Sequence, residues 1–222
     1  MNIEPKIPMC IVVQLENGCG KHSRRVWLPL PATKKQFASA VKALDTHCCG
    51  IAINHYAPRV PGIARYMLAN TPLAQVNHLA ARLAKLDNEQ LIKLCAVIES
   101  EMYFTTVEQF IEYTYDSDMF TLIPGIFNEE DLGRHELGKM DTLPESVKKS
   151  IDPHTFGLNI ATATESEFTS FGYLMKNTGR SGKKANRCIP ASLDLKGSYG
   201  EDLYGEPDYI PEGIEDIGAV CP

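Results

Sequence analysis

The cysteines and histidines near the N-terminus are the first residues that could do chemistry, because both side chains bind metal ions. Cys19 and His22 lie three positions apart, and His47, Cys48 and Cys49 follow at the end of a predicted helix. Structural zinc sites normally present two clean pairs of ligands. The spacing here is loose, and adjacent cysteines point in different directions. The sequence therefore favours a solvated loop with small thiols over a zinc site, and we expect neither a metal nor a cofactor.

Nucleotide binding and catalysis find no support in the motifs. The segment Gly18–Ser23 resembles a phosphate-binding loop, but that motif needs glycine where Leu15 stands and serine or threonine where His22 stands. The serine nucleophile motif G-x-S-x-G does not occur. The remaining histidines are scattered singly, as is typical of surface or packing residues: His55, His78, His135 and His154. We expect that the protein is not an enzyme.

The acidic residues in the middle of the chain form the most unusual pattern. Between Leu94 and Gly133 there is no lysine, arginine or histidine. The same stretch contains the acids Glu99, Glu101, Glu108, Glu112, Asp116, Asp118, Glu129, Glu130 and Asp131. Opposite charges at i,i+4 stabilise a helix by about 0.2–0.5 kcal/mol, whereas Glu108 and Glu112 repel each other at this spacing. Such a face is either a solubilising surface or an imitation of duplex DNA, which carries one charge per about 1.7 Å.

The basic residues concentrate in the first part of the chain. Residues 1–97 contain 12 bases and 5 acids, residues 98–175 contain 4 and 15, and residues 176–222 contain 6 and 8, for a net charge of −6. The first segment includes Arg24, Arg25, Lys34, Lys35 and Lys42. A basic domain can be a phosphate footprint. The nearby aromatic residues, Trp27 and Phe37, fit core positions, so a solvated basic face is favoured over a nucleic-acid surface.

Composition places the protein among soluble domains. The 222 residues are 44% hydrophobic and 23% charged, which disfavours long disorder and coiled coil. Apolar runs such as 10–13 are much shorter than the roughly 20 residues of a membrane span. The N-terminus lacks the pattern of a secretory signal, and seven cysteines without a framework pattern indicate reduced thiols. We therefore expect a cytoplasmic protein.

The elements that must position these residues can be read from local patterns. The runs 9–15 and 24–30 are typical of a β-hairpin, Thr33 and Gln36 have the spacing of a helix capping box, and 51–56 is a further strand. Apolar residues at helical spacing predict helices after Thr71-Pro72 and after Asp87. A third helix follows a capping box that we place at Thr105 and Glu108.

The third part of the chain is mixed. Residues 119–126 predict a strand, and Asn128 can cap a helix whose first turn is acidic. Residues 156–162 and 167–175 look extended and could pair as a hairpin. The fold class is therefore α+β, an elongated row of three small domains with a C-terminal tail. The expected parts are an N-terminal α/β domain at 1–60, a helical domain at 61–117, a C-terminal α/β domain at 118–177 and a flexible tail at 178–222.

Several phrases of the sequence occur in a known order. They are VWLPLPAT at 26–33, VNHLAARLAKLD at 76–87, the run from 106 to 137 that contains LIPGI, LPESVKKSIDPHTFGLNIA at 143–161, and FTSFGYL at 168–174. In this order the chain resembles the ArdA-type antirestriction proteins, especially the longer relatives on Gram-positive mobile elements. The combination of LIPGI, an acidic turn and Leu132-Gly133-Arg134 carries most of the specificity.

The resemblance implies an elongated homodimer, joined through its last domain, whose acidic surface acts as a DNA mimic. Such proteins occupy the DNA-binding groove of type I restriction-modification enzymes and protect a mobile genetic element. Carried onto this sequence, the implied surface is Glu108, Glu112, Asp116, Asp118, Glu129, Glu130, Asp131 and Glu136, and charge alone adds Glu99 and Glu101. This hypothesis needs no direct contact with nucleic acid. The alternative is a non-mimic regulatory module that binds nucleic acid or a partner through its basic N-terminal face.

Overall fold

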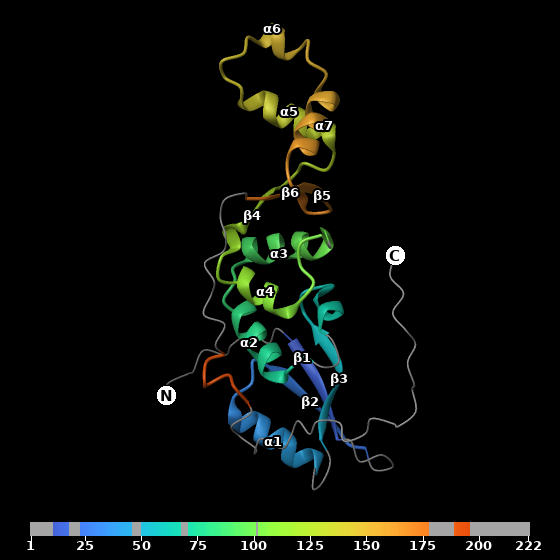
Figure 1. Cartoon of the computed structure of the whole chain (residues 1–222), viewed down its shortest axis with the longest axis vertical. Coiled ribbons are helices and arrows are strands. Elements are labelled where there is room, and N and C mark those ends of the chain that lie inside the picture. Colours follow the sequence, from blue (N-terminus) through green and yellow to red (C-terminus); the bar gives the residue numbers. More distant parts are fainter. Residues whose placement is uncertain are drawn as a thin grey trace, which may run out of the picture.

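The chain forms an elongated α+β structure with two small sheets at different heights along its long axis (Figure 1). This computed structural model describes residues 11–17, 23–45, 50–67, 71–100, 102–177 and 189–195. Across these residues there are seven α-helices and two three-stranded antiparallel sheets. The predicted α+β class is confirmed, whereas the division into a row of three domains stays a prediction.

The N-terminal sheet has the strand order β2-β1-β3. Its strands are β1 (Ile11–Asn17), β2 (Arg25–Leu30) and β3 (Ile51–Pro58). Side chains alternate along β1 between fully buried and half-buried positions, as a sheet with one covered face requires. β1 and β2 pair antiparallel, with Gln14 opposite Trp27. The predicted hairpin and third strand are thus confirmed.

Helix α1 (Lys34–Leu44) covers the inner face of this sheet and begins where the sequence predicts. The Thr33 hydroxyl accepts a hydrogen bond from the backbone N–H of Gln36, and the Gln36 side chain accepts one from the backbone N–H of Thr33. The buried residues Phe37, Val41 and Leu44 recur every three or four positions on one side of the helix. This reciprocal cap satisfies two N–H groups that the helix itself cannot pair.

Three helices form the middle of the molecule. They are α2 (Leu73–Leu83), α3 (Asn88–Ser100) and α4 (Val107–Tyr113), preceded by the 3₁₀ helix η2 (Ile63–Tyr66). α2 begins one residue later than Thr71-Pro72 predicts, with Pro72 as its N-cap. The predicted capping box at Thr105 and Glu108 is wrong by one position. Thr106 is the N-cap of α4, and the reciprocal partner is Gln109.

The last described part combines helices with the second sheet, whose order is β4-β6-β5. Its elements are the 3₁₀ helix η3 (Ser117–Met119), β4 (Phe120–Ile123), α5 (Glu129–Lys139), α6 (Glu145–Lys148), α7 (Pro153–Ala163), β5 (Ser166–Thr169) and β6 (Gly172–Lys176). The strand predicted at 119–126 is present but shorter, because Met119 belongs to η3 and the chain turns after Ile123. The Asn128 cap is confirmed. α5 and α7 pack side by side at one end of the molecule (Figure 1).

The prediction of an extended segment at 156–162 is wrong, because these residues belong to α7. The Asp152 carboxylate accepts a hydrogen bond from the backbone N–H of Thr155 at 2.9 Å, and Pro153 occupies the first turn. Both features favour a helix start. The expected hairpin instead forms entirely within 166–176, where β5 and β6 pair antiparallel.

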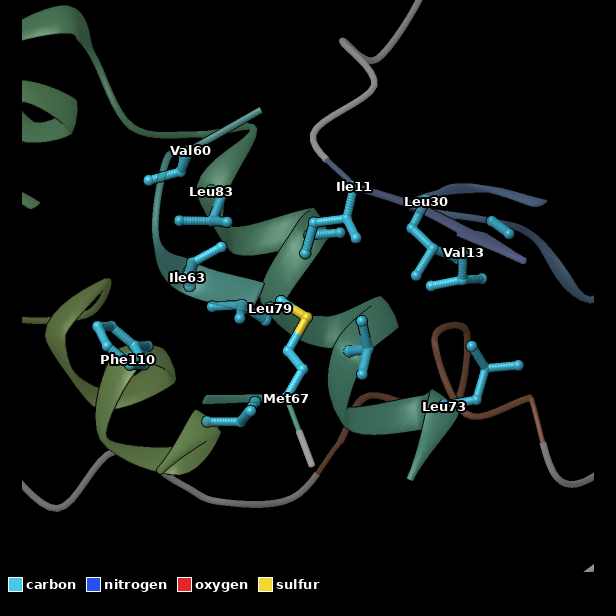
Figure 2. Packing of buried hydrophobic residues seen from close by; sticks show 14 of the residues in the cluster. Ile11, Val13, Leu30, Val60, Ile63, Met67, Leu73, Leu79, Leu83 and Phe110 are labelled. Atoms are coloured by element: carbon cyan, nitrogen blue, oxygen red, sulfur yellow. The ribbon is translucent and has the colours of Figure 1, made fainter. Parts of the chain in front are cut away.

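One hydrophobic cluster runs from the N-terminal sheet through the helices to Phe120 and Leu174. Figure 2 shows its centre, where Leu79 and Leu83 of α2 lie among Ile11, Ile63 and the side chains around them. A smaller cluster around Ile126, Leu132 and Tyr173 holds α5 and α7 on the second sheet.

Residues 189–195 return to this larger cluster. Leu195 is buried, and the Asn77 side-chain amide donates to the backbone carbonyl of Leu193 at 3.1 Å. The rest of the expected tail lies outside the described residues. The domain boundaries near 60, 117 and 177 stay predictions.

Candidate functional site

The acids of the predicted surface lie on consecutive elements along the long axis. Glu99 is near the end of α3, and α4 contains Glu108 and Glu112. Asp116 directly precedes η3, and Asp118 lies within it. The last four, Glu129, Glu130, Asp131 and Glu136, are in α5. Figure 1 shows α3 and α4 near the middle of the molecule and α5 toward one end. Glu101 lies outside the described residues.

The α4 segment presents two carboxylates without a counter-charge. Glu108 is exposed and Asp116 is half-buried, and neither side-chain carboxylate has a hydrogen-bond or ion-pair partner among the residues that the structure describes. Glu108 lies in the first turn of α4, where a negative charge complements the helix dipole. Glu112 lies one turn further on and is half-buried.

Bases from outside the acidic stretch hold the loop after α4 in place. Arg82 of α2 donates to the backbone carbonyl of Thr114, and its guanidinium lies 3.7 Å above the centre of the Tyr115 ring. Lys93 of α3 donates to the backbone carbonyl of Ser117 at 3.3 Å. These contacts go to carbonyls and a ring. Arg82 and Lys93 lie before the acidic stretch in the sequence, and they contact residues more than 20 positions further on. The spacing of residues within a helix could therefore not predict these contacts.

His78 of α2 lies one helical turn before this arginine. It is buried, and its Nε2 is 3.1 Å from the Tyr115 hydroxyl. Burial, together with the charges of Arg82 and Lys85, lowers the pKa of His78 below its usual value.

Acidification should therefore weaken the fold at this position. The pKa of His78 is lower in the folded than in the unfolded state, so the full free energy of unfolding is present above about pH 6.5 and decreases as the pH falls toward the folded-state pKa. The total decrease is about 1.4 kcal/mol for each pH unit that separates the two pKa values. Urea unfolding at about pH 7.5 and about pH 5.5 measures the loss, which should shrink in His78→Gln. Equal pH dependence in the wild type and in His78→Gln would contradict the prediction.

Helix α5 carries four of the acids in different environments. The Asn128 side chain caps the helix, and the Asp131 carboxylate accepts a hydrogen bond from the Phe127 backbone N–H at 3.3 Å. Glu130 forms an ion pair with Arg134, and Glu136 forms one with Lys139 at 2.8 Å. Glu129 is half-buried and has no partner among the described residues.

Two further acids are engaged by other elements. The Glu99 carboxylate accepts hydrogen bonds from the backbone N–H and the hydroxyl of Ser170, at 2.8 and 2.5 Å, and so joins α3 to the β5–β6 turn. Asp118 lines a hollow of about 420 Å³ together with Glu89 and Lys93. Of the predicted acids, Glu108, Asp116 and Glu129 are therefore the ones without a partner in the part of the chain that the structure describes.

Metal and thiol chemistry gain no structural support. No group of three or more potential ligands comes together among the described residues. The cysteines and histidines of the weak zinc pattern, Cys19, His22, His47, Cys48 and Cys49, lie outside those residues. Cys95 is half-buried, and burial raises the pKa of its thiol, which disfavours reactivity. Within the described part of the chain, no helix is both long and apolar enough to span a bilayer.

The basic N-terminal face differs from the prediction in one respect. Phe37 is buried as expected, but Trp27 is 50% exposed. Since Leu28 and Leu30 fill the inner face of β2, the strand alternation turns Trp27 to the outer face. Arg24 pairs with Asp45 at 3.3 Å, and Arg25 pairs with Glu16 at 3.2 Å.

Comparison with protein families identifies a relationship over most of the chain. The model of a family described as "Antirestriction protein (ArdA)" matches residues 20–175, which include every acid of the predicted surface. A search among curated proteins found no match.

Proposed function

The chain belongs to the ArdA family of antirestriction proteins, and from that membership we propose that it is a DNA mimic that occupies the DNA-binding groove of a type I restriction-modification enzyme. The family match supplies the antirestriction function. The mechanism and the target are proposed here from the acids and their surroundings.

The observation that carries the proposal is a set of three carboxylates that have no partner among the described residues. Glu108, Asp116 and Glu129 come from α4, the following loop and α5, which succeed one another in an elongated molecule (Figure 1). Carboxylates that no internal base neutralises keep their charge for an external cationic surface. A groove built for DNA supplies such a surface, since its lysines and arginines bind phosphates.

The engaged acids contribute in a different way. Glu130 and Glu136 are paired with exposed bases of α5, and exposed ion pairs are worth only about 0–1 kcal/mol. A cationic groove can therefore compete for them. Asp131 and Glu99 instead fix the helix start and the contact between α3 and the β5–β6 turn. We assign them a mainly structural role.

The remaining proposals follow from the same family. The protein acts as an inhibitor without catalysis, in the cytoplasm, as a homodimer joined through its last domain. In this proposal the homodimer protects a mobile genetic element from restriction in the cell.

Competition for the enzyme tests the proposal. A fluorescently labelled duplex that carries the recognition sequence is bound to a type I methyltransferase complex, and the full chain is titrated in. We expect complete displacement, with an apparent inhibition constant that rises in proportion to the duplex concentration, because a mimic and DNA share one site. Displacement that saturates below completion, or an inhibition constant independent of the duplex, would place the protein at another site. Restriction relief without any DNA competition would also reject the mimic.

A further inference from the structure

No described helix or strand covers the outer face of the N-terminal sheet, which carries the protein's single tryptophan. Trp27 on β2 is 50% exposed. Its ring lies 5.8 Å from that of His55 on β3, in an edge-to-face arrangement, and His55 is also exposed. Gln14 of the central strand lies opposite both residues in the register. Two aromatic rings thus meet across the middle of an open three-stranded face.

Local contacts hold this face in shape. The Asn54 side-chain amide donates to the side-chain oxygen Oε1 of Gln14 at 3.2 Å, at the point where the β1–β3 register shifts. Because the inner residues Val13, Leu15 and Leu28 are buried in the main core, the strands cannot rotate to hide the rings. A flat apolar ligand that covered the exposed part of the Trp27 ring would gain hydrophobic stabilisation.

Charge identifies the kind of ligand. The segment 1–97 has 12 bases against 5 acids. Arg25 lies two residues before Trp27 on the same side of β2, and the exposed Arg59 follows β3. The ion pairs of Arg24 with Asp45 and of Arg25 with Glu16 are formed by well-exposed guanidinium groups. Arg25 contacts both carboxylate oxygens of Glu16, from Nε at 3.2 Å and from Nη2 at 3.3 Å, and a phosphate offers the same pair of oxygens to this guanidinium.

We infer that the outer face of the N-terminal sheet binds single-stranded nucleic acid, with a base stacked on Trp27 beside His55 and with phosphates at Arg25 and Arg59. Open sheets that present aromatic rings bind unpaired bases in this way, since every base has a flat apolar face. In a duplex the bases are already stacked on one another and cannot reach the ring. The face lies at the opposite end of the long axis from α5 (Figure 1), and the inference does not depend on the proposed mimicry.

The tryptophan itself reports binding. The full chain is titrated with oligodeoxythymidylate of about 12 nucleotides, within the range that one such module covers. Because the sequence has one tryptophan, any quenching of indole fluorescence comes from Trp27. We expect quenching, and an affinity that falls steeply as salt is raised.

Variants separate stacking from charge attraction. Trp27→Ala should weaken binding of a labelled oligonucleotide by about tenfold or more, whereas Trp27→Phe keeps a ring and should retain most of the affinity. Phe127→Ala removes another exposed aromatic, in the acidic part of the chain, and should change nothing. Circular dichroism of each variant verifies the fold.

Three results would overturn the inference. The first is no quenching by the oligonucleotide at low salt. The second is binding that Trp27→Ala leaves unchanged, or that a duplex reproduces equally well, since charge alone would then be responsible. The third is self-association of the full chain that Trp27→Ala abolishes while the oligonucleotide does not bind, because the face would then belong to a second copy.

Discussion

Reversing the charge of Glu108 and Glu129 together should reduce affinity for a type I methyltransferase complex at least about 100-fold, or about 2.7 kcal/mol. Neither carboxylate has a partner among the described residues, so Glu108→Lys with Glu129→Lys breaks no internal ion pair there. In a cationic groove each lysine replaces an attraction with a repulsion, and like charges brought together cost several kcal/mol. Displacement of labelled duplex from the enzyme measures the effect.

A variant of equal net charge tests whether arrangement matters. Asp141→Lys with Glu145→Lys changes the charge by the same amount, at two exposed positions beyond α5 and outside the acidic stretch, and the one described ion pair that it breaks, between Glu145 and Lys148, lies at the surface. We expect it to lose no more than about threefold, since long-range attraction changes but no proposed contact does. Equal losses in the two variants would show that net charge alone drives binding. Full inhibition by the Glu108 and Glu129 variant would remove these residues from the site.

The acidic residues show which features of the candidate site can be predicted from the charge pattern of the sequence. The pairs of Glu130 with Arg134 and of Glu136 with Lys139 have helical spacing, so they could have been predicted from the sequence. The hydrogen bond between Glu99 and Ser170 joins residues that are 71 positions apart, so no local sequence pattern predicts it. The sequence therefore identifies the acidic stretch, while tertiary contacts decide which of its carboxylates stay free.

The same distinction holds for the fold: contacts between neighbours in the sequence were predictable, whereas contacts between distant residues were not. The starts of α1 and α5 were predictable because Thr33 and Asn128 form their capping bonds with residues three positions away. Alternation along β2 was also present in the sequence, yet the aromatic character of Trp27 suggested a core position, and two buried leucines on the other face decided otherwise.

Helix α7 was missed for a related reason. Its Asp152-Pro153 start was present in the sequence, but Gly157 and β-branched residues lower the helix propensity of the segment. Glycine is needed at position 157 because the backbone of α5, which is distant in the sequence, lies directly against it. A Cβ atom at Gly157 would lie 1.8 Å from the backbone carbonyl oxygen of Glu129 in α5, and one at Gly133 would lie 1.8 Å from that of Pro153. The two helices touch backbone to backbone at these glycines.

Gly157→Ala should consequently destabilise the protein by about 3 kcal/mol, although alanine is ordinarily better than glycine in a helix by about 1 kcal/mol. The added methyl group cannot be accommodated by a side-chain movement, because the atoms that it meets are the backbone of Glu129 and Gly133. α5 and α7 must separate, which opens the small core around Ile126, Leu132 and Tyr173. Urea unfolding followed by circular dichroism measures the loss.

Gly138→Ala is the matched control, because it places the same methyl group in α5 where nothing lies within 4 Å. We expect it to be neutral or to gain up to about 1 kcal/mol from helix propensity. The clash at Gly157 displaces the backbone of Glu129, whose carboxylate has no partner among the described residues. Gly157→Ala should therefore also weaken displacement of DNA from the enzyme, whereas Gly138→Ala should not. If both variants are equally stable, α5 and α7 do not touch at these glycines. If Gly157→Ala is destabilised yet inhibits fully while folded, the position of Glu129 does not matter to the groove, and the acids of α4 must account for the inhibition.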